Sequence, residues 1–72
     1  MVNVNKLRGK IVEKNMSVDK LADEIGIDRA TLYRRLNSGG ENFLIKEADA
    51  ITKILGLDCE EATAIFFAQY VA

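Results

Sequence analysis

The sequence contains no histidine and no proline, and its only cysteine is Cys59. One cysteine cannot form an intramolecular disulfide, and a chain without histidine lacks the usual ligands and bases for zinc, haem or Cys/His catalysis. We therefore expect no metal site, no cofactor, no catalytic residues and no small-molecule substrate. The sequence does not predict an enzyme.

Long apolar runs are also missing, because the longest one covers only the five residues 64–68. A helix needs roughly 20 apolar residues to cross a bilayer, and a signal peptide also has a longer apolar core than this. A cytoplasmic location without a membrane segment is the expectation. With 72 residues, 49% hydrophobic and 29% charged, the composition predicts one globular domain over residues 1–72.

The net charge of −1 conceals an asymmetry along the chain. Residues 1–35 carry eight basic and five acidic groups, a net charge of +3, whereas residues 36–72 carry two basic and six acidic groups, a net charge of −4. A basic half joined to an acidic half indicates that one face meets a polyanion while the other has a different role.

Apolar residues at helical spacing, together with capping residues and glycines, predict five short helices and no strand. The first is expected at about 4–15, the second between the cap Ser17 and Gly26, and the third at about 28–37 after the cap Asp28. The fourth ends at Gly56 and has no capping residue directly before it, and Asp58 caps the fifth. The positions predicted to face the core are Leu7, Ile11, Val12, Val18, Leu21, Ala22, Ile25, Ile27, Leu32, Leu36, Phe43, Leu44, Ile45, Ala48, Ile51, Ile54 and Leu55.

The stretch from Ser17 to Asn37 carries the most specific pattern in the chain. Two helices joined by such a short turn cross steeply, so that their closest point has room only for a small side chain such as Ala22. The turn itself needs a positive φ angle, which Gly26 adopts without steric cost. Few other motifs require this combination at this spacing.

This stretch, LADEIGIDRATLYR, closely resembles the helix-turn-helix of the lambda-repressor-like family, the Cro/CI type of bacterial and phage regulators. The resemblance covers nearly the whole chain, since KEADAITKILGL occupies the position of the family's fourth helix. It implies an all-α, five-helix DNA-binding domain with the helix-turn-helix formed by helices 2 and 3, as in small phage-type regulators. Two positions differ from the family pattern. Arg35 stands where an apolar residue is common, so the inward role is expected to pass to Leu36, and Val18 replaces a glutamine that often contacts phosphate.

The resemblance also implies which residues meet DNA, with the third helix entering the major groove. Arginine suits guanine, asparagine suits adenine and an alanine methyl suits the thymine methyl. Asp28 is interpreted as a cap rather than as a reader of cytosine. The predicted base contacts are Arg29, Ala30, Tyr33, Arg34 and Asn37, and the predicted phosphate contacts are Ser17, Thr31, Ser38, Asn42 and Lys46.

The fifth helix has two apolar stripes, of which a single core uses only one. Ala62, Ile65 and Phe66 form the first stripe, and the second contains Phe67 and Val71 with Tyr70 beside it. One interpretation is a homodimer through Phe67, Tyr70 and Val71. The other is that the first helix and the segment 2–4 bury both stripes.

Two functions from different classes are compatible with this sequence. The first is a sequence-specific transcriptional regulator, repressor-like or Cro-like, that binds a double-stranded DNA operator as a homodimer. The second is a protein-interaction module on a helix-turn-helix scaffold, such as an anti-repressor, an antitoxin-like protein or an assembly protein, that binds its partner through the acidic fourth and fifth helices.

Overall fold

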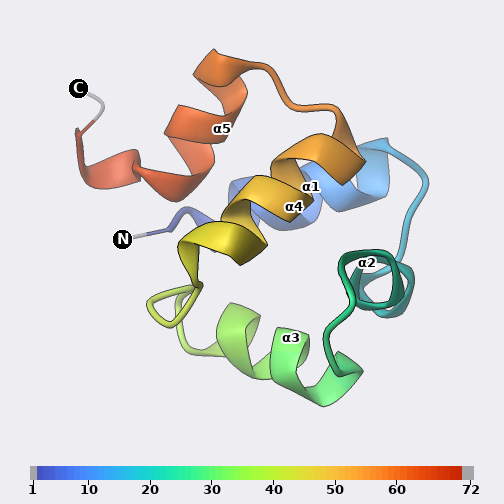
Figure 1. The fold of residues 1–72 in the computed structure, drawn as a ribbon. Helices are drawn as coiled ribbons and strands as arrows, with labels where there is room; N and C mark the ends of the chain where they lie inside the picture. The colour runs from blue at the N-terminus through green and yellow to red at the C-terminus, as the bar shows by residue number, and fades with distance from the viewer. Residues whose placement is uncertain (1, 71–72) are drawn as a thin grey trace.

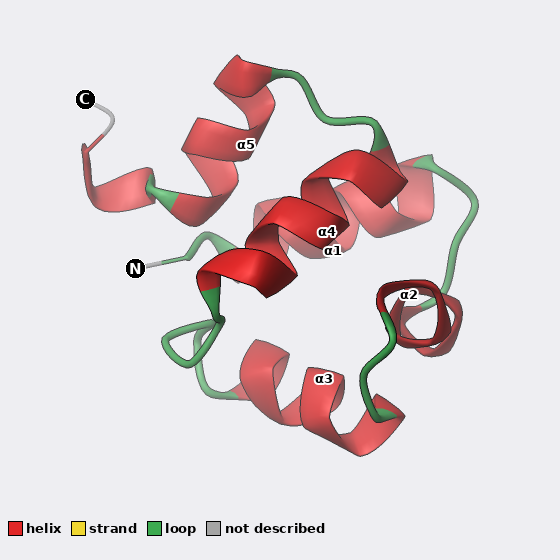
Figure 2. Cartoon of the chain, in the orientation of Figure 1, coloured by secondary structure: helices red, strands yellow, loops and turns green. Residues whose placement is uncertain are grey.

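The computed structural model describes residues 2–70, and all regular structure in that range is helical (Figures 1 and 2). The five α-helices confirm the predicted all-α fold. They are followed by one short 3-10 turn. The elements are α1 (Val4–Glu13), α2 (Val18–Ile25), α3 (Arg29–Asn37), α4 (Ile45–Leu55), α5 (Cys59–Phe66) and the 3-10 turn η1 (Ala68–Tyr70).

Side-chain caps begin four of the helices at the residues that the sequence indicates or next to them, and Asp28 is the cap of α3. Asn3 accepts from the amide of Lys6 at 3.0 Å to begin α1, and the Ser17 hydroxyl accepts from the amide of Lys20 at 3.1 Å to begin α2. Asp58 does the same for α5, accepting from Glu61 at 2.8 Å. These bonds satisfy amides that have no partner inside the helix.

One helix boundary differs from the sequence expectation, and one helix has a cap that the sequence does not indicate. α1 ends at Glu13 rather than near residue 15, because Asn15 adopts a φ of 59°, which is incompatible with a continuing right-handed helix. α4 lacks a capping residue before it but is still capped, since the Glu47 carboxylate accepts from the backbone amide of Leu44 at 3.0 Å. That bond is one half of a capping box.

The apolar core is built from all five helices. α2 packs on α3 and α4, and α1 packs on α5. In Figure 1, α3 and α5 lie at opposite ends of the molecule. Phe43, in the loop before α4, meets Phe66 edge to face with ring centroids 6.0 Å apart. The buried apolar residues are Leu7, Ile11, Leu21, Ala22, Leu32, Leu36, Ile51, Leu55, Leu57, Ile65 and Phe66.

Four residues that were predicted to face the core lie at the surface instead. Val12 is 72% exposed, Ile45 87%, Leu44 49% and Ile54 39%. In α4 the buried line runs through Ile51 and Leu55, so a residue six positions before Ile51 projects about 120° away from it. Leu44 precedes the first turn, and Val12 stands one position beyond the buried line of α1. The interpretation of these four as core residues is wrong.

Helix α5 is tied to the N-terminal segment and to α1. The Asn3 amide donates to the Ile65 carbonyl at 2.7 Å, and Lys10 of α1 forms an ion pair with Glu61 of α5. α1 thereby covers the stripe that contains Ile65 but leaves Phe67 54% exposed. The prediction that α1 and segment 2–4 bury both stripes is therefore wrong for Phe67.

Tyr70 is 77% exposed, and Val71 lies outside the described residues. In the part of the chain that the structure describes, no helix has the length and apolar character needed to cross a membrane.

Candidate nucleic-acid interface

Gly26 ends α2 and forms the turn that leads into α3. Its φ is 77°, and its amide donates to the Ala22 carbonyl at 3.0 Å. The amide of Ile27 donates to the same carbonyl at 3.1 Å. Ala22 is fully buried, which fits a close approach of the two helices. The chain therefore turns within three residues and starts α3 at a fixed angle.

Helix α3 has a sharply divided surface. Asp28 accepts from the Ala30 amide at 2.8 Å and so acts as the cap. Leu32 is 0% exposed and Leu36 is 3% exposed, so the inner face is fixed in the core. The residues predicted to contact bases all lie on this helix outside the buried face, namely Arg29, Ala30, Tyr33, Arg34 and Asn37.

Arg35 explains how α3 accommodates a charged residue beside its core face. Its Nε lies 2.7 Å from Oε1 of Glu47, and its Nη2 donates to Oε2 of Glu47 at 2.9 Å. The Glu47 side chain is only 5% exposed and the Arg35 side chain 20%. This two-point ion pair links α3 to the first turn of α4, and Leu36 takes the inward position as the sequence predicts.

Three of the predicted phosphate contacts gather beside a predicted base contact. Thr31, Ser38 and Asn42 line a shallow pocket of about 360 Å³ together with Arg34 and Arg35. The Arg34 guanidinium also donates to the Thr31 hydroxyl at 3.3 Å. Arg35 is already paired with Glu47, so the pocket offers the Arg34 guanidinium together with hydroxyl and amide groups, which are donors that suit a phosphate oxygen.

The other two predicted phosphate contacts do not line this pocket. Lys46 is exposed in the first turn of α4. Ser17 is exposed at the beginning of α2, where its hydroxyl oxygen already accepts from Lys20.

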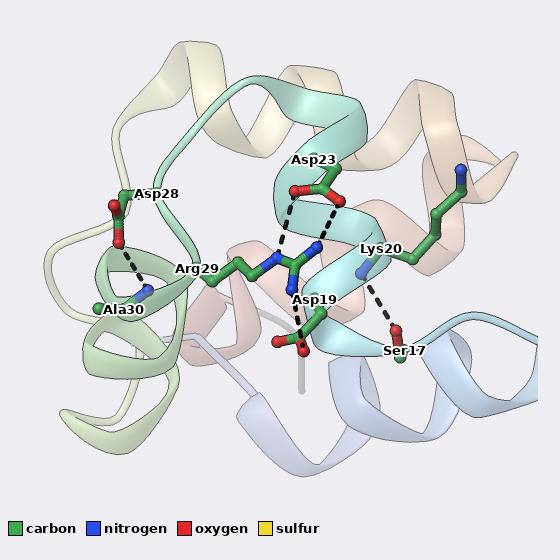
Figure 3. Close-up of polar contacts among 7 residues, drawn as sticks. All are labelled: Ser17, Asp19, Lys20, Asp23, Asp28, Arg29 and Ala30. Atoms are coloured by element: carbon green, nitrogen blue, oxygen red, sulfur yellow. Dashed lines mark hydrogen bonds and ion pairs between the residues drawn. The ribbon is translucent and has the colours of Figure 1, made fainter.

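Arg29 is exposed but is not a free cation, as Figure 3 shows. Its Nη2 donates to Oδ2 of Asp23 at 2.9 Å and its Nε to Oδ1 of the same carboxylate at 3.3 Å. Its Nη1 lies 3.6 Å from Oδ2 of Asp19. The hydrogen bond from Arg29 holds the pKa of Asp23 below its ordinary value. Two acidic residues of α2 therefore flank the first arginine of α3.

Two further contacts involve the exposed face of α3. The neighbouring Asp19 carboxylate raises the pKa of Tyr33, and the guanidinium of Arg8 donates to the side-chain oxygen of Asn37 at 3.2 Å. Sequence reasoning did not identify Arg8, Asp19, Asp23 or Glu47 as part of this region. The spacing of Asp19 and Asp23 by four residues on one face of α2 is a pattern that could have indicated them.

The chemistry of this face is that of recognition. It offers guanidinium, hydroxyl, amide and methyl groups on a helix narrow enough for the major groove of DNA. Among residues 2–70 there is no group of three cysteine, aspartate or glutamate side chains that could hold a metal ion.

Comparison with known proteins identifies the same region. The family described as the Cro/C1-type HTH DNA-binding domain matches residues 6–65, a span that contains α2 to α4, the helix-turn-helix and most of α1 and α5. No curated protein and no solved structure matches the chain. The family match covers 60 of 72 residues and agrees with the helical fold and the glycine turn. The chain therefore belongs to the family of Cro/C1-type helix-turn-helix DNA-binding domains.

Proposed function

We propose that this protein is a sequence-specific transcriptional regulator, repressor-like or Cro-like, that binds a double-stranded operator with α3 in the major groove. The observation that carries the proposal is the exposed outer face of α3 directly beside the pocket formed by Thr31, Ser38 and Asn42. A duplex presents base edges and phosphates next to one another, and a protein that reads sequence has to contact both.

Within this proposal Arg34 is the principal base contact. It is exposed, it lies at the pocket, and the contact it makes in the described part is with the neutral Thr31 hydroxyl. Its guanidinium therefore retains N–H groups for the O6 and N7 atoms of guanine. Tyr33, Asn37 and the Ala30 methyl group extend the contact surface along the helix. Arg29 belongs to the same face, with its side chain held by Asp23.

Phosphate contacts would fix the position of α3 in the groove. We assign them to Thr31, Ser38 and Asn42 around the pocket, with Lys46 at the start of α4 and Ser17 at the start of α2 on either side. Such contacts set the register of the protein on DNA and carry no sequence preference of their own.

A homodimer completes the proposal, because one α3 helix contacts only a few base pairs. Two copies would contact half-sites about 34 Å apart, one turn of the duplex, in a pseudo-palindromic operator. The exposed Phe67 and Tyr70 next to α5 support this arrangement.

Selection of bound fragments from a random pool of duplex DNA tests the function directly. We expect enrichment of a short motif repeated with inverted symmetry at a spacing of about one helical turn. Recovery of a pool without any enriched motif would contradict sequence-specific binding.

A second candidate is a protein-interaction module that uses the same scaffold. The exposed Ile45 and Phe67 line an apolar groove between α4 and α5, and this is the observation in its favour. A salt titration separates the two functions. Affinity for DNA falls with a log–log slope of about −0.9 per neutralised phosphate, whereas binding of a protein in an apolar groove responds little to salt.

A further inference from the structure

The contact between Arg29 and α2 has a geometry that bears on how the protein discriminates between DNA sequences. One edge of the guanidinium, formed by Nε and Nη2, is engaged by the Asp23 carboxylate. The remaining nitrogen, Nη1, faces Asp19 at 3.6 Å. All three nitrogens therefore lie near a carboxylate oxygen, and the two aspartates more than balance the charge of the arginine.

These groups are close to solvent, with the side chains of Arg29, Asp23 and Asp19 56%, 52% and 46% exposed. An exposed ion pair of this kind contributes little to folding, so its removal leaves the domain intact. It still competes for the guanidinium against any other anion, and a DNA phosphate is such an anion.

We propose that Asp23 and Asp19 are specificity-determining residues that withhold the Arg29 guanidinium from the phosphate backbone. This inference rests on the proposed function. A guanidinium released from both aspartates contacts phosphates in any sequence, and such contacts strengthen cognate and non-cognate binding alike. Pairing of the Arg29 guanidinium with the two aspartates weakens non-cognate binding. Discrimination between DNA sequences then depends on Arg34 and its neighbours.

The experiment is a double-mutant cycle measured with random-sequence duplex DNA over a range of salt concentrations. Asp23→Asn keeps the shape of the side chain but removes its charge. We expect it to raise the affinity for random DNA about threefold to fivefold and to steepen the log–log salt slope by about 0.9, which corresponds to one further phosphate contact. In an Arg29→Ala background the same substitution should have little effect, because the released cation is absent.

Glu24→Gln is the matched control. It also removes one negative charge from α2, but its partner is Lys20, at 3.0 Å, and not Arg29. Whatever change it causes should be the same in the native protein and in the Arg29→Ala background. Asp23→Glu, which retains a carboxylate, should stay close to the native affinity.

The possible results distinguish failure of the proposed function from failure of the proposed role of Asp23. If no form of the protein binds duplex DNA even at low salt, the proposed function is overturned. If the native protein binds but Asp23→Asn has no effect, or has the same effect in the Arg29→Ala background, the function stands and the role of Asp23 is overturned.

Discussion

Arg34 is the residue whose surroundings best suit a base contact. It projects from the exposed face of α3 and is not engaged by a carboxylate in the described part of the chain, unlike Arg29 and Arg35. The difference between these three arginines lies in their partners, which the sequence does not display. Arginine at three positions of one helix thus has three different environments.

Replacement of Arg34 by alanine should reduce affinity for a selected operator by about 1–3 kcal/mol and relax the preference at one base position. Binding to the operator and to its single-base variants measures both effects. Lys46→Ala is the comparison, since loss of a phosphate contact weakens all sequences alike. An Arg34→Ala protein with native affinity and native base preference would exclude Arg34 as the principal base contact.

Gly26 and Gly9 are a matched pair for testing the turn before α3. Neither would place a Cβ within 4 Å of another group, but Gly26 has a φ of 77° while Gly9 lies within α1. Gly26→Ala should destabilise the fold by about 1–2 kcal/mol through backbone strain alone. Gly9→Ala should instead stabilise it by about 0.5–1 kcal/mol. Urea denaturation of both variants provides the comparison, and destabilisation of equal size would argue against strain at residue 26.

At the scale of the elements, α3 is held by packing on α2 and by one ion pair to α4. The Leu32 and Leu36 side chains fix its rotation, and Arg35 with Glu47 fixes its distance from the start of α4. This arrangement keeps the exposed face of α3 rigid, which is the condition for a helix that binds the groove without prior rearrangement.

Arg35→Ala should destabilise the domain by about 3 kcal/mol, because the nearly buried Glu47 carboxylate would lose its partner. A second substitution, Glu47→Leu, should recover a large part of that loss in the Arg35→Ala background, since it removes the unpaired charge. Chemical denaturation of the single and double variants measures the effect. No recovery in the double variant would indicate that Glu47 acts chiefly as the cap of α4.

The positions of the helices could largely be predicted from the sequence, because the residues that start and end a helix act locally. Caps such as Ser17 and Asp28 and the glycines at 26 and 56 act within one turn, so that α2, α3 and the end of α4 are found where the pattern places them. Positions such as Val12 and Ile45 could not be assigned, because apolar character alone does not define rotation about a helix. The partners of Arg29 and Arg35 depend on tertiary packing between helices, which spacing in one segment does not encode.

At the scale of the whole molecule, the first and last α-helices are joined by the ion pair between Lys10 and Glu61. The hydrogen bond from Lys10 lowers the pKa of Glu61 from its ordinary value of 4.5, and the same bond raises the pKa of Lys10 from 10.5. The pair therefore stabilises the fold between these two ordinary values. Its contribution is lost as the pH falls through the lowered pKa of Glu61, or rises through the raised pKa of Lys10.

Thermal unfolding as a function of pH tests this linkage. Glu61→Gln should lower the melting temperature near neutral pH and reduce the loss of stability that the native protein shows below pH 4.5, the ordinary pKa of this carboxyl. Glu60→Gln, one position earlier and exposed, is the control and should retain the native pH profile. If both variants follow the native profile, the ion pair makes no measurable contribution.

The proposed dimer is tested by sedimentation at micromolar concentration. We expect a dimer that Phe67→Glu converts to a monomer, because a charge would replace an exposed aromatic ring at the contact. Val12→Glu is the comparison, as Val12 is also exposed but lies on α1, and it should leave the dimer intact. A monomeric native protein would remove the dimer from the proposal.

Glu47 both caps α4 and pairs with Arg35, and this affects how the sequence between α3 and α4 can change in evolution. Its Oε1 accepts from the Leu44 amide and also lies 2.7 Å from Nε of Arg35, while its Oε2 accepts from Nη2 of Arg35, so the same side chain anchors both α3 and the start of α4. Lengthening a connection whose ends are fixed costs little, about 0.6 kcal/mol for each doubling. The exposed positions of this connection, among them the proposed phosphate contacts Ser38 and Asn42, can therefore change while Phe43 stays packed on Phe66 and the orientation of α3 is preserved. Phosphate contacts and base preference can then evolve separately.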